Sequence, residues 1–182
     1  SKLMIESMIA DASRAHGFNY VILRYFNVAG ADPKGRSGQV LLGGTHIFAN
    51  AICAALGKAE KIEIYGDDYD TADGTCIRDF IHVSDLADIH LSALRHLEDN
   101  GGRNIMNCGY GKGYSVRQVI DIINAQLETP VSTCVVERRP GDIVTAVADT
   151  ARLNKTLSWH PNYDIQSIAK TALDWARRMD KA

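Results

Sequence analysis

Apolar positions along the chain change repeatedly between the period of a helix and the period of a strand. Apolar residues recur at helical spacing from Leu3 to Ala12 and stop before Gly17, whereas the β-branched and aromatic run at 18–26 predicts a buried strand. Strands that alternate with helices predict an α/β protein with parallel strands. The pattern predicts further strands at 61–65, 80–83, 104–108 and 131–136, and helices at 45–56, from Ser84, from Ser115 to about 127, at 150–157 and at 165–179.

Polar residues stand where several of these helices begin. Ser115 and Gln118 have the spacing of a capping box, and Ser84 is a good N-cap for the helix that follows it. Asp149 and Asp164 precede the last two helices. Side-chain oxygens at these positions can accept hydrogen bonds from the first backbone N–H groups, so they predict the helix starts.

Two long irregular stretches interrupt the pattern. Residues 27–44 contain five glycines and Pro33, and residues 66–79 contain a cluster of aspartates. Loops of this length inside compact domains tend to be functional. A calcium loop that starts at Asp68 fails, because Ala72 and Asp73 stand where an acid and a glycine are required. We therefore expect a solvated acidic loop whose carboxylates cap turns at glycines 66 and 74.

Composition narrows the class of protein. The chain has 182 residues, 46% of them hydrophobic, and a formal net charge of -2. These values are ordinary for a folded domain and give no electrostatic footprint for a nucleic acid or an anionic membrane. The apolar stretch 47–56 is only about half of a membrane span. Four cysteines without a CxxC pair predict reduced thiols in a cytoplasmic protein.

Several residues are candidates for binding an anion. Gly109, Gly111 and Gly113 follow a strand, but Tyr114 stands where a dinucleotide loop has its third glycine, so a plain turn is favoured. His46 stands where the glycine-rich stretch enters a helix, whose first N–H groups can meet an anion. Arg78 and the segment 138–142 (RRPGD) lie beside strand ends. Their guanidinium groups suit a nucleotide diphosphate, with Asp142 on a sugar hydroxyl, but surface ion pairs explain the spacing equally well.

These segments, in this order, resemble the UDP-glucose 4-epimerase family, a branch of the extended short-chain dehydrogenases/reductases. The resemblance covers nearly the whole chain. Its most specific part is YDTADGTCIRDFIHV at 69–83, because related dehydratases and decarboxylases have a shorter connection there. The other matching segments are SKLMIE at 1–6, LRYFNVAGADPKG at 23–35, NCGYGKGYSV at 107–116, RRPGD at 138–142 and ADTARLNKTLSWHP at 148–161.

The resemblance implies that the chain is the C-terminal part of an extended Rossmann-type, NAD-binding α/β fold together with a smaller α/β substrate-binding domain. Residues 1–30 would end the NAD-binding domain. Residues 31–182 would form the UDP-sugar-binding domain, with some elements packing back on the Rossmann sheet. Lys2 matches the lysine of the family's YxxxK pair, so the tyrosine would precede residue 1. The full-length family commonly forms homodimers.

The resemblance also implies a reaction and a set of site residues. In the family, transient oxidation at C4 by NAD lets a 4-keto sugar turn over while UDP stays bound, so binding energy belongs at the nucleotide. The implied positions are Lys2, Tyr25 and Phe26 at the cofactor; Asn27 at the diphosphate or the sugar; His46 and Ile47 at the diphosphate; the backbone of Glu63 and Tyr65 at uracil; Arg78 and Arg139 as diphosphate clamps; Asp142 at the ribose; and Ala146 beside the sugar.

Three readings of the function stay open at this stage. The first is an NAD-dependent epimerase of UDP-glucose and UDP-galactose, of which this chain is the substrate-binding half. The second is a UDP-sugar-binding fragment without activity of its own. The third is a related epimerase of UDP-pentoses, UDP-uronates or UDP-N-acetylglucosamine, the last favoured by the small side chain of Ala146, which would leave room for an N-acetyl group.

Overall fold

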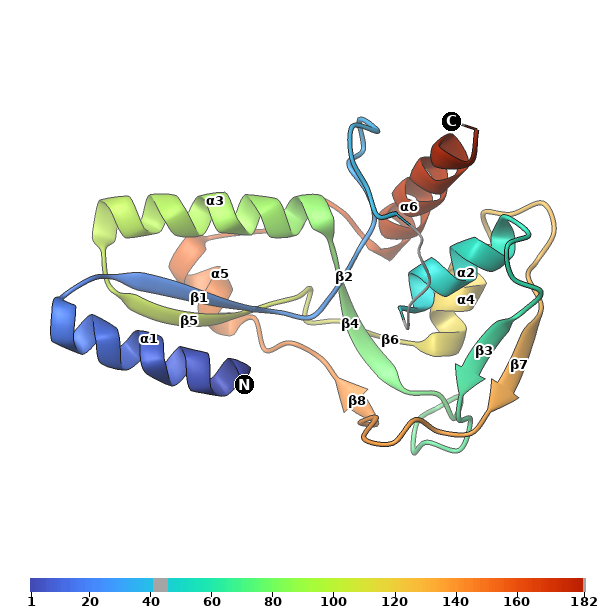
Figure 1. Ribbon diagram of the computed structural model, residues 1–182, viewed down its shortest axis with the longest axis horizontal. Coiled ribbons are helices and arrows are strands. Elements are labelled where there is room, and N and C mark those ends of the chain that lie inside the picture. The colour runs from blue at the N-terminus through green and yellow to red at the C-terminus, as the bar shows by residue number, and fades with distance from the viewer. Residues whose placement is uncertain (41–45, 182) are drawn as a thin grey trace.

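The chain folds as an elongated α/β molecule with two lobes joined by crossing strands (Figure 1). We describe a computed structural model, which places residues 1–40 and 46–181. The first lobe contains α1 (Lys2–His16), β1 (Tyr20–Tyr25), α3 (Val83–Asn100), β5 (Arg103–Cys108) and α5 (Ala151–Leu157). The second contains α2 (Ile47–Ala55), β3 (Ile62–Tyr65), α4 (Val116–Asn124), β7 (Thr133–Val136) and α6 (Ile165–Asp180). Strands β2 (Asn27–Ala29), β4 (Ile77–His82), β6 (Gly113–Ser115) and β8 (Thr145–Ala146) form the sheet between them.

The first lobe is built on a parallel pair of strands. β1 and β5 pair from Tyr20 opposite Arg103 to Tyr25 opposite Cys108. Helix α3 runs along one side of the pair and α1 along the other (Figure 1). The expected end of α1 is confirmed, because Gly17 takes the left-handed conformation (φ 75°) that closes a helix. The core of the first lobe is formed by Ile81, Leu86, Ile89, Met106, Cys108, Leu153 and Trp159.

The second lobe packs three helices over its own core. Phe48 on α2, Val119 on α4 and Ile168 on α6 are all buried there, together with Phe80 from β4. Its small sheet pairs β3 with β7 in parallel. The capping box at the start of α4 is confirmed, although α4 ends three residues before the predicted position 127. The carboxylate of Asp164 accepts the N–H of Ser167, as its place before α6 predicted.

The central sheet corrects two predictions. Residues 27–29 form strand β2, although the glycine-rich stretch from 27 was expected to be a loop. Strand β4 begins at Ile77, three residues before the predicted strand at 80–83, so Arg78 lies on a strand and not in a loop. Both differences have one cause, because β4 pairs with β2, β6 and β8. Neighbours this distant in sequence leave no mark on local residue periodicity.

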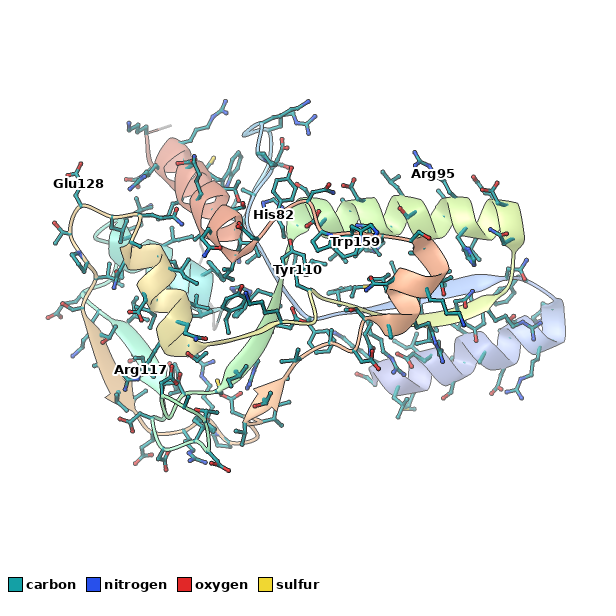
Figure 2. All side chains as sticks on the ribbon, turned by 180° about the vertical axis from the view of Figure 1, so that it is seen from behind. His82, Arg95, Tyr110, Arg117, Glu128 and Trp159 are labelled. Atoms are coloured by element: carbon teal, nitrogen blue, oxygen red, sulfur yellow. The ribbon has the colours of Figure 1, made fainter. Side chains whose placement is uncertain are left out.

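A set of hydrogen-bonded polar groups, which we call the junction cluster, joins the lobes where β4 passes into α3, and two of its members, His82 and Asp85, are fully buried. It consists of His82, Asp85, Tyr110, Asn162 and Thr171, and Figure 2 shows His82 and Tyr110 near the meeting of the lobes. The Tyr110 hydroxyl donates to the Asp85 carboxylate (2.6 Å), which also accepts the N–H of Asn162. His82 Nε2 lies 3.0 Å from the Thr171 hydroxyl on α6. One network of hydrogen bonds therefore ties the two lobes together.

The start of α3 differs from the prediction. Ser84 was expected to be the N-cap, but the helix begins at Val83 and His82 is its N-cap residue. The Nδ1 atom of His82 accepts the N–H of Ser84 at 3.1 Å, so the His82 imidazole caps the helix in place of the Ser84 hydroxyl that was expected to do so. At α5, Thr150 is the N-cap, and the carboxylate of Asp149 accepts the N–H of Ala151, the first residue of the helix.

Candidate functional site

A cleft of about 250 Å³ opens in the second lobe, between β3, the start of α2 and the β7–β8 connection. Eight residues proposed from the sequence line it: Asn27, His46, Ile47, Glu63, Tyr65, Arg78, Arg139 and Asp142. They come from β2, α2, β3, β4 and the connection after β7, so the tertiary fold alone brings them together. A wall with two arginines and several polar side chains suits an anionic ligand.

Arg78 and Asp142 face each other across this cleft. The Nη2 atom of Arg78 lies 3.4 Å from the Asp142 carboxylate, at the long end of the hydrogen-bond range. A second guanidinium nitrogen of Arg78 donates to its neighbour's carbonyl, Ile77 O, at 2.8 Å. The Arg78 side chain is only 15% exposed, whereas that of Asp142 is 31% exposed. Arg78 is therefore a half-buried cation whose one carboxylate partner is held only weakly, and an incoming anion can add to its hydrogen bonds.

The adjacent arginines 138 and 139 lie in different surroundings, although their spacing left them equivalent. Arg139 lines the cleft, and its guanidinium carbon lies 3.5 Å from the centre of the Tyr65 ring. The Tyr65 hydroxyl donates to the Glu63 carboxylate. Arg138 does not line the cleft and forms an ion pair with Asp68. Arg138 thus makes a surface ion pair, whereas Arg139 lines the cleft.

His46 lies in the wall of the cleft between two phenylalanines. Its ring centre is 6.1 Å from that of Phe48 and 6.3 Å from that of Phe80. Both ring nitrogens are buried and make no hydrogen bond of normal geometry to the residues that the structure describes, although the Val28 backbone lies near enough to favour the charged form slightly. Burial lowers the pKa of His46, because the apolar surroundings disfavour its charged form. A neutral imidazole in the wall of the cleft can donate an N–H group to a ligand oxygen.

Among the cleft residues that sequence reasoning missed, Asn50 and Tyr114 offer polar side chains. Asn50 follows His46 by one helical turn on α2, so helical spacing could have pointed to it. Tyr114 enters through strand β6, which pairs it directly with Arg78. No local signal predicts that pairing, because the two residues are far apart along the chain. Cys76, one of four free cysteines, also lines the cleft.

The glycine-rich turn at 109–113 encloses a carboxylate of the protein itself. Asp79 is fully buried and accepts the N–H groups of Tyr110 (2.9 Å), Gly111 (2.9 Å) and Ala148 (3.1 Å). A Cβ atom at Gly109 would lie 2.5 Å from an Asp79 oxygen. The plain-turn prediction is confirmed: this turn wraps around Asp79, and its glycine permits the close approach.

The acidic loop at 66–74 is only partly the solvated loop that was expected. Asp73 bonds to the backbone N–H and the hydroxyl of Thr75 (2.9 and 2.7 Å), and the Ser115 hydroxyl also donates to it. Asp73 therefore ties the loop to the start of α4. Asp67 lies 3.8 Å from Arg117, which Figure 2 shows on the outside of the second lobe. No group of three or more His, Cys, Asp or Glu side chains among the described residues could hold a metal ion.

Four of the proposed positions lie outside the cleft. Lys2 is exposed at the start of α1, and Tyr25, 55% exposed, ends β1 in the first lobe. Phe26 follows it and donates its N–H to Cys108 O. Ala146 pairs with Arg78 in the β4–β8 register but does not line the cleft. The cleft thus brings together the positions proposed for the nucleotide, including Asn27, and leaves apart the three cofactor positions and Ala146.

A comparison with protein families places the chain. The sequence profile described as "NAD dependent epimerase/dehydratase family" matches residues 1–109, more than half of the chain. The chain belongs to this family. Within residues 1–40 and 46–181, no helix has the length and apolar character needed to cross a membrane.

Curated relatives from this family match the chain from end to end. The UDP-glucose 4-epimerase of Azospirillum brasilense is 50% identical over 183 residues, which cover 100% of this chain and 53% of that protein. The UDP-glucose 4-epimerase of Rhizobium meliloti (strain 1021) is 41% identical over 181 residues, which cover 100% of this chain and 55% of that protein. The chain therefore spans about half the length of the curated relatives it matches.

Solved structures of the family share the fold. The UDP-glucose 4-epimerase of Stenotrophomonas maltophila, with bound NAD and formylated UDP-arabinopyranose, aligns with a TM-score of 0.94 at 33% identity over 99% of this chain and 54% of that one. The enzyme from Bifidobacterium longum, in complex with NAD⁺ and UDP, aligns with a TM-score of 0.89 at 37% identity over 97% of this chain and 53% of that one. The expected Rossmann-like α/β fold of this family is confirmed.

Proposed function

We propose that the chain is the C-terminal portion of a UDP-glucose 4-epimerase and supplies its UDP-sugar-binding half. The observation that carries the proposal is the cleft itself, because the fold gathers eight positions proposed from the family resemblance around one cavity. Relatives that match the whole chain are UDP-glucose 4-epimerases, and one aligned structure contains UDP. The complete enzyme would interconvert UDP-glucose and UDP-galactose in the cytoplasm.

The cleft residues divide the nucleotide between them. Arg78 and Arg139 would clamp the diphosphate, because a guanidinium offers paired donors that match phosphate oxygens. Asp142 would accept a ribose hydroxyl once the ligand engages Arg78. The backbone of Glu63 and Tyr65, at the open end of β3, would read the uracil edge.

Three further cleft residues, His46, Ile47 and Asn27, would also contact the ligand. His46, neutral because it is buried, would donate to a phosphate oxygen next to Ile47 at the start of α2. Asn27 would hold the diphosphate or the sugar. Strong binding at the nucleotide leaves the hexose free to turn, which the C4 reaction requires.

The cofactor of this function is NAD, which when bound accepts and returns the hydride at C4 of the sugar. The residues present fit one edge of such a cofactor. Tyr25 is exposed at the carboxyl end of a parallel strand, where α/β sheets bind nucleotides, and Phe26 follows it. Lys2 would hold ribose hydroxyls and lower the pKa of a tyrosine base contributed from outside this chain.

The division of the chain follows from the same proposal. Residues 1–30 would complete the NAD-binding domain, and residues 31–182 would form the UDP-sugar-binding domain. The parallel pairing of β5 with β1 supports our view that some later elements pack back on the first domain. The complete enzyme would be a homodimer.

A second candidate function is a UDP-sugar-binding fragment without turnover. It is favoured because every proposed nucleotide contact lies in the chain, whereas the family's tyrosine base does not match any residue in it. Purified chain supplied with NAD⁺ and UDP-galactose should form no UDP-glucose. Formation of UDP-glucose under these conditions would show that the chain is active by itself.

A test of substrate choice concerns Ala146. A small side chain beside the sugar would leave room for an N-acetyl group, so the full-length enzyme should also convert UDP-N-acetylglucosamine. Ala146→Tyr should suppress that conversion and spare UDP-glucose. Equal loss on both sugars, or no N-acetyl turnover by the unmodified enzyme, would remove Ala146 from the specificity argument.

The binding function is tested directly by calorimetry of the chain with UDP. We expect measurable heat from the unmodified chain and an affinity lower by about tenfold or more in Arg139→Ala, because a charge-assisted hydrogen bond is lost. Arg95→Ala is the matched control, since Arg95 lies on α3 in the first lobe (Figure 2) and should leave the affinity unchanged. A folded chain that gives no heat with UDP contradicts the proposal.

A further inference from the structure

The neighbouring arginines of the β7–β8 connection point to different aromatic rings. Arg139 lies against Tyr65 in the cleft, and Arg138 lies with its guanidinium carbon 4.0 Å from the centre of the Tyr69 ring. Tyr69 is only 4% exposed and belongs to the acidic loop at 66–74. The Arg138 guanidinium therefore stacks on a buried tyrosine ring that belongs to a different loop.

The same guanidinium group grips the acidic loop at two further points. Its Nε atom donates to the Asp68 carboxylate at 2.5 Å, and its Nη2 atom donates to the Asp68 backbone carbonyl. The exposed ion pair alone would contribute little, because the Asp68 side chain is 72% exposed and water screens the charges. A cation–π contact and a backbone hydrogen bond in the same group make the attachment directional and fix the backbone of the loop.

A glycine, Gly66, lies directly against the Arg138 side chain. Gly66 has a φ of 86°, and a Cβ atom there would lie 2.5 Å from Cγ of Arg138 and 2.9 Å from the Tyr69 ring. The Gly66 N–H also donates to Val136 O at 2.9 Å, at the end of β7. A glycine at this point brings the loop that follows β3 close to the loop that follows β7. Both loops border the cleft, which Gly66 also lines.

We propose that Arg138 is a positioning residue for nucleotide binding: it ties the 66–74 loop to the 138–142 loop and thereby holds Arg139 and Asp142 in the cleft. This inference rests on the proposed binding of UDP. The physical reason is entropic, because a connection that is already ordered does not have to be immobilised when the ligand binds. Arg138 itself does not line the cleft, so its effect passes through the loop.

The decisive variant is Asp68→Ala, because charge and positioning predict opposite signs. UDP is an anion and the chain has a net charge of -2, so removing a carboxylate should strengthen binding if only charge matters. Loss of the tie between the loops should instead weaken binding of UDP, by about threefold, and Arg138→Ala should weaken it by about tenfold. Asp70→Ala is the matched control, since Asp70 is an exposed carboxylate of the same loop, and it should bind UDP at least as tightly as the unmodified chain.

A double variant separates positioning from direct contact. If Arg138 acts through Asp68, the Asp68→Ala and Arg138→Ala changes should not add, and the double variant should bind UDP about as well as Arg138→Ala alone. Thermal unfolding without ligand should show the Asp68→Ala and Asp70→Ala chains melting at the same temperature. The affinity change would then have no counterpart in overall stability.

The outcomes distinguish this inference from the proposed function. Failure of the unmodified, folded chain to bind UDP overturns both. Binding of UDP by the unmodified chain, with equal or tighter binding by Asp68→Ala, overturns the positioning role alone. Weaker binding that only follows a lowered melting temperature of Asp68→Ala assigns the Arg138 contacts to stability and also overturns it.

Discussion

The junction cluster and the cleft are both rich in polar side chains, but they differ in what satisfies their hydrogen bonds. At the junction, Asp85 accepts from Tyr110, Asn162 and Tyr163, and His82 is bonded through both ring nitrogens. In the cleft, the Arg78 guanidinium donates to Ile77 O but reaches its carboxylate partner Asp142 only at 3.4 Å, and the buried ring of His46 is without a hydrogen bond of normal geometry to the described residues. Because buried polar groups are normally paired, the fully bonded Asp85 and His82 are structural, whereas His46 and Arg78 keep hydrogen-bonding capacity that a ligand can use.

The largest effect should come from removing the carboxylate at the centre of the junction. Asp85 is fully buried, and Asp85→Ala leaves the N–H groups of Asn162 and Tyr163 without an acceptor. We expect the free energy of unfolding in urea to fall by about 3 kcal/mol. Asp88→Ala, on the exposed side of the same helix, should change it by less than about 0.5 kcal/mol. Equal stability of the two variants would remove the distinction between the clusters.

In the cleft, the opposite pattern is expected: a substitution should reduce ligand affinity and leave stability nearly unchanged. Arg78→Ala should weaken UDP binding by about thirtyfold in calorimetry, which corresponds to about 2 kcal/mol. Its free energy of unfolding should change by less than about 1 kcal/mol, because its partner Asp142 is exposed enough to be solvated. A large loss of stability with little loss of affinity would place Arg78 in the structural class with Asp85.

A smaller effect is expected for a single hydroxyl group at the junction. The Tyr110 hydroxyl donates to Asp85 and accepts the N–H of His82 at 3.1 Å, and burial raises the pKa of Tyr110. Tyr110→Phe keeps the ring and leaves that N–H unpaired, so chemical denaturation should show a loss of about 1.5 kcal/mol. UDP affinity should not change. An affinity change would mean that the two clusters are energetically coupled.

The smallest effect is a dependence of stability on pH. Burial lowers the pKa of His82 below its ordinary value, although the Asp85 charge opposes this. As pH falls through the unfolded value near 6.5, the unfolded chain takes up a proton that folded His82 does not, so stability is lost on acidification by at most about 1.4 kcal/mol per pH unit.

The matched variant for this measurement is His82→Asn, which keeps an acceptor for the Ser84 N–H and does not titrate. Unfolding followed between about pH 7.5 and 5.5 should show a shallower loss of stability than in the unmodified chain. The pKa of His46 is lowered as well, so some of the slope should remain. An unchanged slope in His82→Asn would exclude His82 as its source.

Much of the secondary structure could be predicted because its signals are local. The capping box of Ser115 and Gln118 and the cap at Asp164 act within one helical turn, and both are present. The prediction failed at β4, whose first residues are ordered by β6 and β8 from far along the chain. It failed at His82 for a related reason, since a histidine becomes a cap only where the fold buries its ring between Tyr163 and Thr171.

For the cleft, too, some features could be predicted from the sequence and others could not. Residue types alone left Arg138 and Arg139 equivalent, and family resemblance favoured Arg139. The chain's own sequence therefore determined the order of helices and strands, the local caps and the set of side chains able to hold an anion. Only the tertiary structure showed that Arg139 lines the cleft while Arg138 pairs with Asp68, that the 109–113 turn encloses Asp79, and that Tyr114 pairs with Arg78. Those outcomes depend on strand pairing and burial between distant segments, and such contacts have no expression in local periodicity.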